Sequence, residues 1–389
     1  MIEKLLKFSL GKIFTCMLML ILLCSCSTQD TRTVVQFASW GSKSEIDIIK
    51  PILQKFEEQN PDIKVDFMHI PQNYFQKIHL LFASNTPPDV IFINNLYLPI
   101  YANAGVLEPI DGVFDTSQYN ENVLKALSFK NKLYAMPRDV SNLVVFYNKD
   151  FFDKYNVKYP DEKWTFSDFL NTAEKLTKDG KFGVSFEEKP MYILPFLMSE
   201  GGGILDDDLK TLIIDNDNSQ RALNYYANLR KKYHVAPLAS ESASATMAQM
   251  FLQGRIAMHI TGRWLVPKYR EEAKFKWDIA AFPNGTAGSI VPLDASGWAI
   301  SKNTKHKTEA IKLINYLSSK NNIEQLAKSG LIVPARQDAA NSKYFLDGKS
   351  PKNAKVFLTI IKTAKPTPVP VNYQEITDRL TPKFERLFN

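Results

Sequence analysis

The feature that most constrains the fold is an alternation of strands and helices that begins at residue 34. Residues 34–38 form an apolar run typical of a strand, and residues 44–59 carry isoleucine, leucine and phenylalanine at helical spacing. A strand of alternating polarity (63–67), a second helical pattern (75–82) and a wholly apolar strand (90–93) follow. Strands that alternate with helices in this order pair in parallel, with helices on both faces of the sheet. The sequence therefore predicts an α/β fold.

A second set of elements begins after Pro137. Residues 143–147 indicate a strand, and Thr165 can cap a helix while Trp164 and Phe169 pack across its first turn. With 389 residues, the chain is long enough for two or three domains. The remaining patterns indicate helices at 220–233, 245–252, 308–319 and 373–387, and strands at 255–260, 277–282 and 298–301.

The first 26 residues have the pattern of an export signal. Three lysines precede an apolar stretch (13–23) that is shorter than the ~20 residues a membrane-spanning helix needs. The stretch ends in Leu23-Cys24-Ser25-Cys26, which resembles the bacterial lipobox, where a peptidase cuts before the lipid-carrying cysteine. We therefore expect residues 1–25 to be a signal peptide, Cys26 to carry acyl chains such as palmitate, and residues 26–32 to be a tether. A short membrane anchor that is left uncleaved is the alternative.

These features set the expected location of the protein. The lipid would hold it at the outer face of the cytoplasmic membrane, or at an outer membrane if the cell has one. All three cysteines lie within the first 26 residues, so the exported chain has no cysteine pair and depends on core packing. Lysine and arginine exceed aspartate and glutamate by 48 to 41, but no run of five like charges occurs. The charge is too dispersed for a nucleic-acid-binding protein.

The sequence lacks the common signatures of enzymes and cofactor sites. The five histidines are scattered, without the His-Glu-x-x-His spacing of a zinc site, and no Gly-x-Ser-x-Gly motif occurs. Gly348-Lys349-Ser350 lacks the glycine that a phosphate-binding loop has five residues earlier, and residues 206–208 lack the ligand spacing of a calcium loop. We therefore expect no cofactor, no metal and no catalytic residue.

Polar and aromatic residues follow the carboxyl ends of three predicted strands, which is where open α/β sheets bind their ligands. Trp40 follows the first strand, Asn94 and Asn95 follow the strand at 90–93, and Arg263 and Trp264 follow the strand at 255–260. An indole face can stack on the apolar face of a sugar, and planar polar groups can bond two neighbouring hydroxyls. These strand ends favour a carbohydrate site.

The five tryptophans fall into two groups. Trp164 and Trp277 lie where a helix start and a strand are expected, and we interpret them as structural. Trp40, Trp264 and Trp298 lie beside glycines, where a loop can come close to a ligand. For these three, ligand contact and core packing are equally compatible with the sequence.

Nine stretches of the sequence carry a resemblance, in the same order as in a known family: 37–41, 56–65, 83–91, 104–111, 132–137, 147–152, 251–258, 262–264 and 297–302. In these stretches the chain resembles the extracellular solute-binding proteins of family 1, the sugar-binding lipoproteins of ABC importers. The resemblance implies a two-lobed, periplasmic-binding-protein-like (type II) fold, each lobe having a mixed, mainly parallel sheet flanked by helices. It implies a first lobe of residues 33–138 with 290–332 and a second of 139–289 with 333–389.

The resemblance also implies a mechanism in which the ligand is bound and released without any chemical reaction. A sugar enters the cleft, the lobes close around it, and the closed, monomeric protein delivers it to the permease subunits of an ABC transporter. Asp139, Gly297 and Trp298, together with the strand-end residues above, match positions that line the cleft in the family. Many members have aspartate where this chain has Asn94. Further candidates, for which surface or packing roles are the alternative, are Gln72, Tyr74, Glu200 and Tyr373.

Three other functions remain open from the sequence. The first is binding of another solute, such as a glycerol phosphate, a polyamine or a metal complex. The second is a surface-attached glycoside hydrolase, because such enzymes also combine tryptophans with two carboxylates. The third is a structural surface protein without a ligand.

Overall fold

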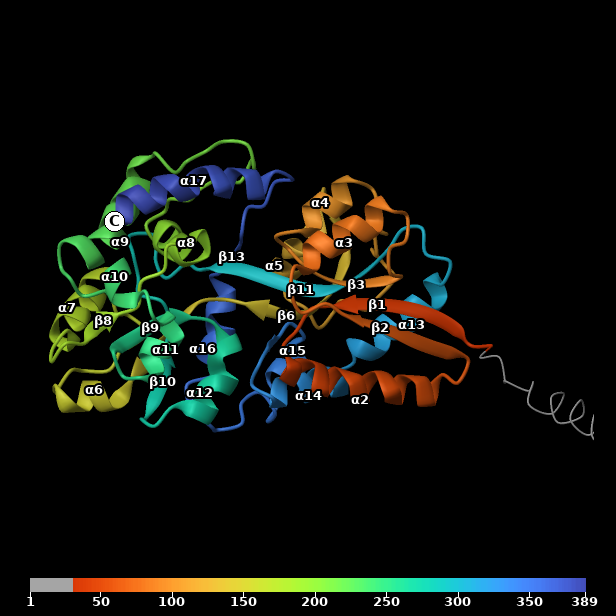
Figure 1. The fold of residues 1–389 in the computed structure, drawn as a ribbon, viewed down its shortest axis with the longest axis horizontal. Helices are drawn as coiled ribbons and strands as arrows, with labels where there is room; N and C mark the ends of the chain where they lie inside the picture. Colours follow the sequence, from red (N-terminus) through yellow and green to blue (C-terminus); the bar gives the residue numbers. More distant parts are fainter. Residues whose placement is uncertain (1–30) are drawn as a thin grey trace, which may run out of the picture.

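The computed structural model describes residues 31–389. The predicted signal peptide (1–25), the lipidation site Cys26 and the part of the tether (26–32) before residue 31 lie outside this range. Figure 1 shows two lobes side by side, each with strands covered by helices. No helix among the described residues has both the length and the apolar character needed to span a bilayer.

The first lobe is built on a seven-stranded sheet. Six of its strands follow the order β12-β6-β11-β3-β1-β2, and the seventh, β13, pairs with the amino end of β11. Parallel pairing joins β1 to both β2 and β3, so these three carboxyl ends meet at one edge. Pairing of β11 with β3 and with β6 is antiparallel. The strands are β1 (Thr33–Ser39), β2 (Ile63–His69), β3 (Val90–Asn94), β6 (Ala135–Ser141), β11 (Pro292–Ile300), β12 (Val333–Pro334) and β13 (Lys365–Pro366).

The second lobe contains a four-stranded sheet with the order β10-β7-β9-β8. Its central strands are buried along their whole length. The strands are β7 (Val144–Asn148), β8 (Phe182–Val184), β9 (Ile256–Thr261) and β10 (Trp277–Ala280), and a small hairpin of β4 (Ser128–Phe129) and β5 (Lys132–Leu133) lies beside the first lobe's sheet.

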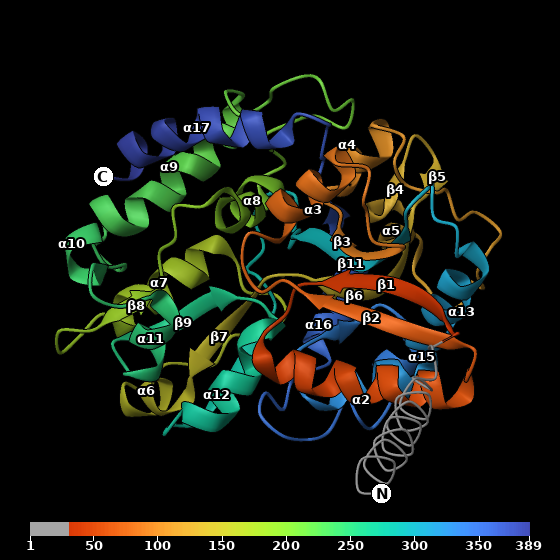
Figure 2. The same cartoon turned by 45° about the vertical axis from the view of Figure 1, so that its right-hand side comes forward.

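Helices cover both faces of the first sheet: α3 and α4 lie on one side and α2, α13 and α14 on the other (Figures 1 and 2). The helices of this lobe are α2 (Lys43–Gln59), α3 (Tyr74–Ala83), α4 (Leu98–Asn103), α5 (Glu121–Ala126), α13 (Lys307–Leu317), α14 (Lys320–Lys328) and α15 (Gln337–Ala340). Those of the second lobe are α6 (Lys149–Lys154), α7 (Phe166–Leu176), α8 (Pro190–Ser199), α9 (Asp217–Lys231), α10 (Ala239–Ser242), α11 (Met247–Leu252), α12 (Val266–Glu272), α16 (Val356–Thr359) and α17 (Tyr373–Phe388), with 3-10 turns η1 (Arg263–Leu265) and η2 (Ile360–Lys362).

Local sequence explains where these helices start. Thr165 and Asp168 form a reciprocal capping box at the start of α7. The rings of Trp164 and Phe169 lie 5.5 Å apart across that turn, so the predicted structural role of Trp164 is confirmed. Trp277 is buried in β10 against Phe146 and Tyr269, which confirms its structural role as well.

The two-lobed α/β fold with mixed sheets agrees with the prediction, and two details differ. Parallel pairing dominates only around β1. Strand β11 runs antiparallel to β3 and β6, and β12 runs antiparallel to β6, whereas β13 runs parallel to β11. The first sheet also includes residues 139–141 and 333–334, which the predicted boundaries gave to the second lobe. Residues 139–141 belong to the first sheet because β6 continues past Pro137 before the chain crosses between the lobes. Residues 333–334 belong to it because β12 pairs with this extended part of β6.

Candidate functional site

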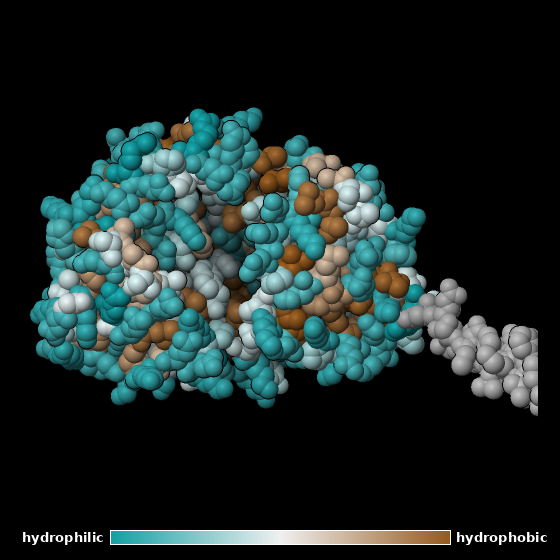
Figure 3. All heavy atoms as spheres, in the orientation of Figure 1, coloured by the Kyte–Doolittle hydropathy of each residue, from teal (hydrophilic) through white to brown (hydrophobic). Residues whose placement is uncertain are grey.

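A cavity of about 260 Å³ lies between the lobes, in the region where Figure 3 shows the surface hollowed. The first sheet contributes β6 and β11 to its wall, and the second lobe contributes η1, which follows β9. Four of the predicted site residues line this one cavity: Trp40, Asp139, Arg263 and Trp264. The fold therefore brings together side chains from distant parts of the chain, three of which were predicted because they follow strand ends.

The wall from the first lobe holds an ion-pair triad. Arg138 is buried and donates to Glu45 Oε1 at 2.5 Å and to Asp139 Oδ2 at 2.9 Å. Its guanidinium carbon lies 4.0 Å from the ring centroid of Phe92. Burial alone would lower the pKa of Arg138, but the two carboxylates reverse this effect and raise it. Two carboxylates share one cation, so the triad is net negative.

Asp139, which lines the cavity, has unused hydrogen-bonding capacity. Its Oδ1 is buried and has no hydrogen-bond partner within residues 31–389. Burial raises the pKa of the Asp139 carboxyl, although the neighbouring Arg138 opposes this effect. A buried acceptor without a donor is costly, which is typical of an atom that awaits a ligand.

Glu45 is a cavity residue that the sequence analysis missed. It lies in the first turn of α2 on the same stripe as Ile49, Ile52 and Phe56, and it is buried with them. A signal was present, since a carboxylate on the apolar stripe of a helix needs a buried cation nearby. That cation is Arg138.

Arg263 forms the opposite wall. Only 2% of the residue is exposed, and its Nε, Nη1 and Nη2 have no hydrogen-bond partner in the described part of the chain. Its guanidinium carbon lies 4.1 Å from the ring centroid of Phe345. Burial lowers the pKa of Arg263 to about 9, and the nearby Arg270 adds to this effect. The group is still a cation at neutral pH, it belongs to a residue that lines the cavity, and no carboxylate is bonded to it in the described part of the chain.

Two half-buried tryptophans complete the cavity. The ring of Trp40 lies 4.3 Å from Phe92 and 5.1 Å from Tyr74, which fixes it at the end of β1. Trp264 lies over Gly262, where a Cβ atom would come within 1.9 Å of the indole Cζ3. Glycine at position 262 is therefore required for the indole to lie in this place.

A larger hollow of about 770 Å³ adjoins the cavity, because Trp40 and Glu45 line both. The start of α2 and the turn before α3 form its walls, and the exposed Gln72 is part of them. The two spaces together have more volume than a single sugar ring fills. Gln72 thus lines the hollow that adjoins the cavity.

The predicted residues at the end of β3 are used within the fold. Asn94 accepts a hydrogen bond from the backbone of Tyr97. Asn95 donates to Asp294 Oδ1 at 2.8 Å, and that oxygen also accepts from Thr367 at 2.8 Å. Burial raises the phenol pKa of Tyr373, at the start of α17, and the charge of Asp294 adds to this effect. These groups tie β3, β11 and the last crossing segment together.

Other predicted residues lie beneath the site or apart from it. Tyr74 is buried and donates to the carbonyl of Ala38 at 3.0 Å, so it supports Trp40. Trp298 is 3% exposed, and Gly297 lets β11 approach Met136, whose carbonyl oxygen a Cβ would meet at 2.2 Å. Glu200 caps the end of α8 and accepts from Thr286, outside the cavity.

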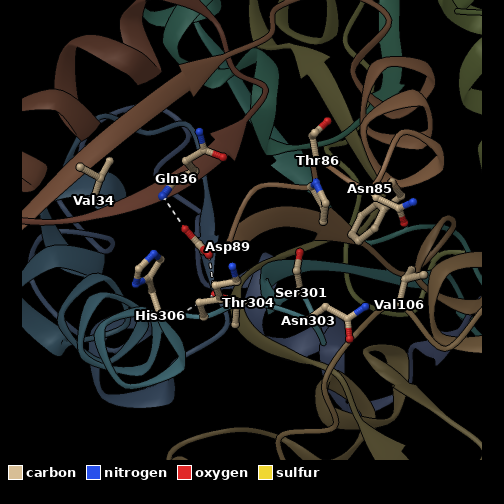
Figure 4. A pocket seen from close by; sticks show the side chains of 13 residues that line it. Val34, Gln36, Asn85, Thr86, Asp89, Val106, Ser301, Asn303, Thr304 and His306 are labelled. Atoms are coloured by element: carbon tan, nitrogen blue, oxygen red, sulfur yellow. Dashed lines mark hydrogen bonds between the residues drawn. The ribbon is translucent and has the colours of Figure 1, made fainter.

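Another cavity, of about 540 Å³, lies at the opposite edge of the first sheet (Figure 4). It is next to the amino ends of β1 and β3, away from the strand ends that carry Trp40 and Asn94. Its buried carboxylate, Asp89, is already bonded by the backbone of Gln36 and the hydroxyl of Thr304. Among the described residues, no group of three or more histidine, cysteine or acidic side chains is arranged to hold a metal ion.

Comparison with known proteins places this geometry in context. A sequence model described as bacterial extracellular solute-binding protein matches residues 52–354. A maltodextrin-binding protein of Bacillus subtilis is 26% identical over 345 residues, covering 82% of this chain and 77% of its own length. A galactooligosaccharide-binding protein of the same species is 22% identical, covering 92% of this chain and 85% of its own.

A solved structure extends the similarity to the whole fold. An ABC substrate-binding protein of Listeria monocytogenes, in complex with cycloalternan, superimposes with a TM-score of 0.83 at 28% identity. The match covers 92% of this chain and 94% of that one. The shared fold therefore extends over both lobes.

Proposed function

The chain belongs to the family of bacterial extracellular solute-binding proteins, and on this premise we propose that it binds an oligosaccharide between its lobes for an ABC importer. The family is extracellular, so the protein is exported. Three of the similar proteins have names or titles that state a ligand, namely maltodextrin, galactooligosaccharide or cycloalternan, all of them sugars. The proposal transfers this class of ligand to the cavity lined by Trp40, Asp139, Arg263 and Trp264.

One observation carries the proposal. Asp139 Oδ1 is an acceptor and Arg263 offers several donors, both are buried without partners in residues 31–389, and both line one cavity from opposite lobes. A sugar hydroxyl both donates and accepts, so neighbouring hydroxyls satisfy both side chains at once. The half-buried indoles of Trp40 and Trp264 supply the apolar surface on which a ring can stack.

The geometry also supports a closing mechanism. Ligand contacts reach β6 on one lobe and η1 on the other, so binding energy is complete only when the lobes are close together. The ligand thereby favours the closed shape, and the closed monomer docks on the permease. The adjoining hollow beside Gln72 holds further rings of an oligosaccharide.

We propose that the ligand is released unaltered. A glycoside hydrolase needs one protonated and one ionised carboxyl group on either side of the scissile bond. Glu45 and Asp139, the two carboxylates of the cavity, instead share the guanidinium of Arg138 on one wall. Incubation with labelled oligosaccharides tests this point, because appearance of shorter products would contradict it.

We also propose that Cys26 carries the lipid that holds the protein at the membrane. The proposal rests on the lipobox-like sequence before that residue. Expression of the full chain and of Cys26→Ala in bacteria fed a palmitate analogue tests it. Label on the first and none on the second is expected, and label on both would contradict it.

A thermal-shift screen tests the sugar-binding proposal. A chain that starts after Cys26 is screened with mono- and oligosaccharides, with glycerol 3-phosphate and spermidine as non-sugar probes. A sugar present at 100 times its dissociation constant should add about 2.7 kcal/mol to the free energy of unfolding. Stabilisation by a non-sugar probe alone, or by no compound, would contradict the proposal.

Two variants then locate the site. Trp264→Ala should weaken binding of the best sugar by about tenfold or more, since an aromatic anchor is lost. Tyr344→Ala, which removes an aromatic ring that is 37% exposed and outside the cavity, is the matched control and should bind normally. Equal affinity of both variants for the sugar would show that the sugar does not bind in this cavity.

A further inference from the structure

The cavity between the lobes holds a cation that the protein itself does not balance. Within residues 31–389 there are three buried arginines, and two of them pair with carboxylates: Arg138 with Glu45 and Asp139, and Arg230 with Glu188 at 2.7 Å. The third is Arg263, which has no hydrogen-bond partner there.

The groups around Arg263 do not supply the missing charge. Phe345 covers the face of the guanidinium, which leaves the N–H groups in its plane without acceptors. Asp347 is the carboxylate whose charge acts on Arg263, but it is already bonded by Arg270 at 2.9 Å. A buried cation in this state is costly unless an anion from outside joins it.

The wall opposite Arg263 has the reverse character. There, Arg138 is shared by Glu45 and Asp139, which leaves one negative charge in excess, and Asp139 Oδ1 is free to accept. The cavity is therefore positive on the side of the second lobe and negative on the side of the first.

Resting on the proposed sugar-binding function, we propose that the ligand is an acidic sugar whose carboxylate, as in a uronic acid, binds Arg263 while its hydroxyl groups donate to Asp139. A carboxylate matches the planar guanidinium with two parallel hydrogen bonds and balances its charge. A neutral hydroxyl can accept one hydrogen bond but leaves the charge uncompensated. The excess negative charge beside Asp139 repels the carboxylate from the other end, so the ligand binds in one orientation.

Matched pairs of neutral and acidic sugars test this inference. Glucose with glucuronate, galactose with galacturonate, and galactobiose with digalacturonate are compared by thermal shift and calorimetry on the chain that starts after Cys26. The acidic member of at least one pair should bind about tenfold tighter than its neutral partner.

Two variants of opposite effect make the test specific. Arg263→Gln should remove the preference for the acidic member, while Asp139→Asn should weaken hydroxyl binding but increase the preference, because a repelling charge is gone. Arg379→Gln, an exposed arginine on α17, is the control and should keep the wild-type preference. Circular dichroism of each variant confirms that it is folded.

The outcomes separate the two proposals. If neutral members bind as well as acidic ones or better, the acidic-sugar inference is overturned and the sugar-binding function stands. A preference for acidic members that persists in Arg263→Gln also overturns it. If no sugar of either kind binds, the proposed function fails together with the inference.

Discussion

Among single residues, Arg138 is the one on which the first lobe's side of the site depends. It is 4% exposed, and it is the only cation bonded to Glu45 and Asp139 among the described residues. Arg138→Met should destabilise the protein by about 3–5 kcal/mol, because two buried carboxylates are left without a partner. Urea unfolding followed by circular dichroism measures this loss.

The exposed Arg379 provides the matched control for this variant. Arg379→Met should change the free energy of unfolding by about 0.5 kcal/mol or less, since its side chain faces solvent on α17. Similar losses in the two variants would show that the triad does not contribute to stability.

Asp294 gives a prediction about pH. Burial raises the pKa of its carboxyl above the ordinary value of 3.8, although hydrogen bonds from Asn95 and Thr367 oppose this effect. The folded state then binds a proton more readily than the unfolded state does. The free energy of unfolding should fall as pH rises from about 3.8, the unfolded value, through the raised folded value.

Asp294→Asn removes this proton uptake while Oδ1 can still accept both hydrogen bonds. The variant should therefore gain stability relative to the wild type as pH rises from 3 to about 7. Urea unfolding at a series of pH values measures the difference. Parallel pH profiles of the two proteins would count against a buried, titrating Asp294.

The sequence predicted part of the site for a clear physical reason. Trp40 follows β1 of the first sheet, and Arg263 and Trp264 follow β9 of the second, and the ends of these strands from two sheets face the same cavity between the lobes. Trp298 belongs to a strand instead, with Gly297 set against β6 and the indole ring 6.1 Å from Phe92. Which face a strand residue takes depends on pairing with distant segments, and that pairing is not visible in local sequence.

At the scale of elements, the junction between β9 and η1 holds Trp264 in place. Gly262→Ala should displace the indole, because the new Cβ would overlap it, and sugar affinity should fall with it. Tryptophan fluorescence and calorimetry measure the two effects.

A double variant gives the control for this prediction. When Trp264 is already alanine, Gly262→Ala should cost no further affinity, since the atom it collides with is absent. Additive losses would mean that Gly262 acts on the site by another route.

Local patterns also predicted the order of elements from β1 to β3 but not the arrangement of β11. Helical spacing and strand alternation are properties of short windows, so β1, α2, β2, α3 and β3 were recognisable. The placement of β11 between β3 and β6 depends on partners about 150–200 residues away. Its register shift between Ser296 and Gly297 depends on the same distant contacts.

At the scale of the whole molecule, the two lobes should approach each other when sugar binds. The cavity takes residues from both lobes, so a ligand that satisfies Asp139 and Arg263 together favours the closed shape. Small-angle X-ray scattering should show a smaller radius of gyration at saturating sugar than without it. In Asp139→Asn combined with Arg263→Gln, the same sugar concentration should leave the radius unchanged, and a full decrease there would contradict this assignment.

The two ends of the described chain lie on different lobes. Residue 31 leads into β1 of the first lobe, whereas α17 ends at Phe388 on the second lobe, against α9 (Figure 2). A donor fluorophore joined before β1 and an acceptor joined after α17 would thus be attached to different lobes. Their energy transfer would report nutrient capture in real time, so the protein is a natural scaffold for a genetically encoded sugar sensor.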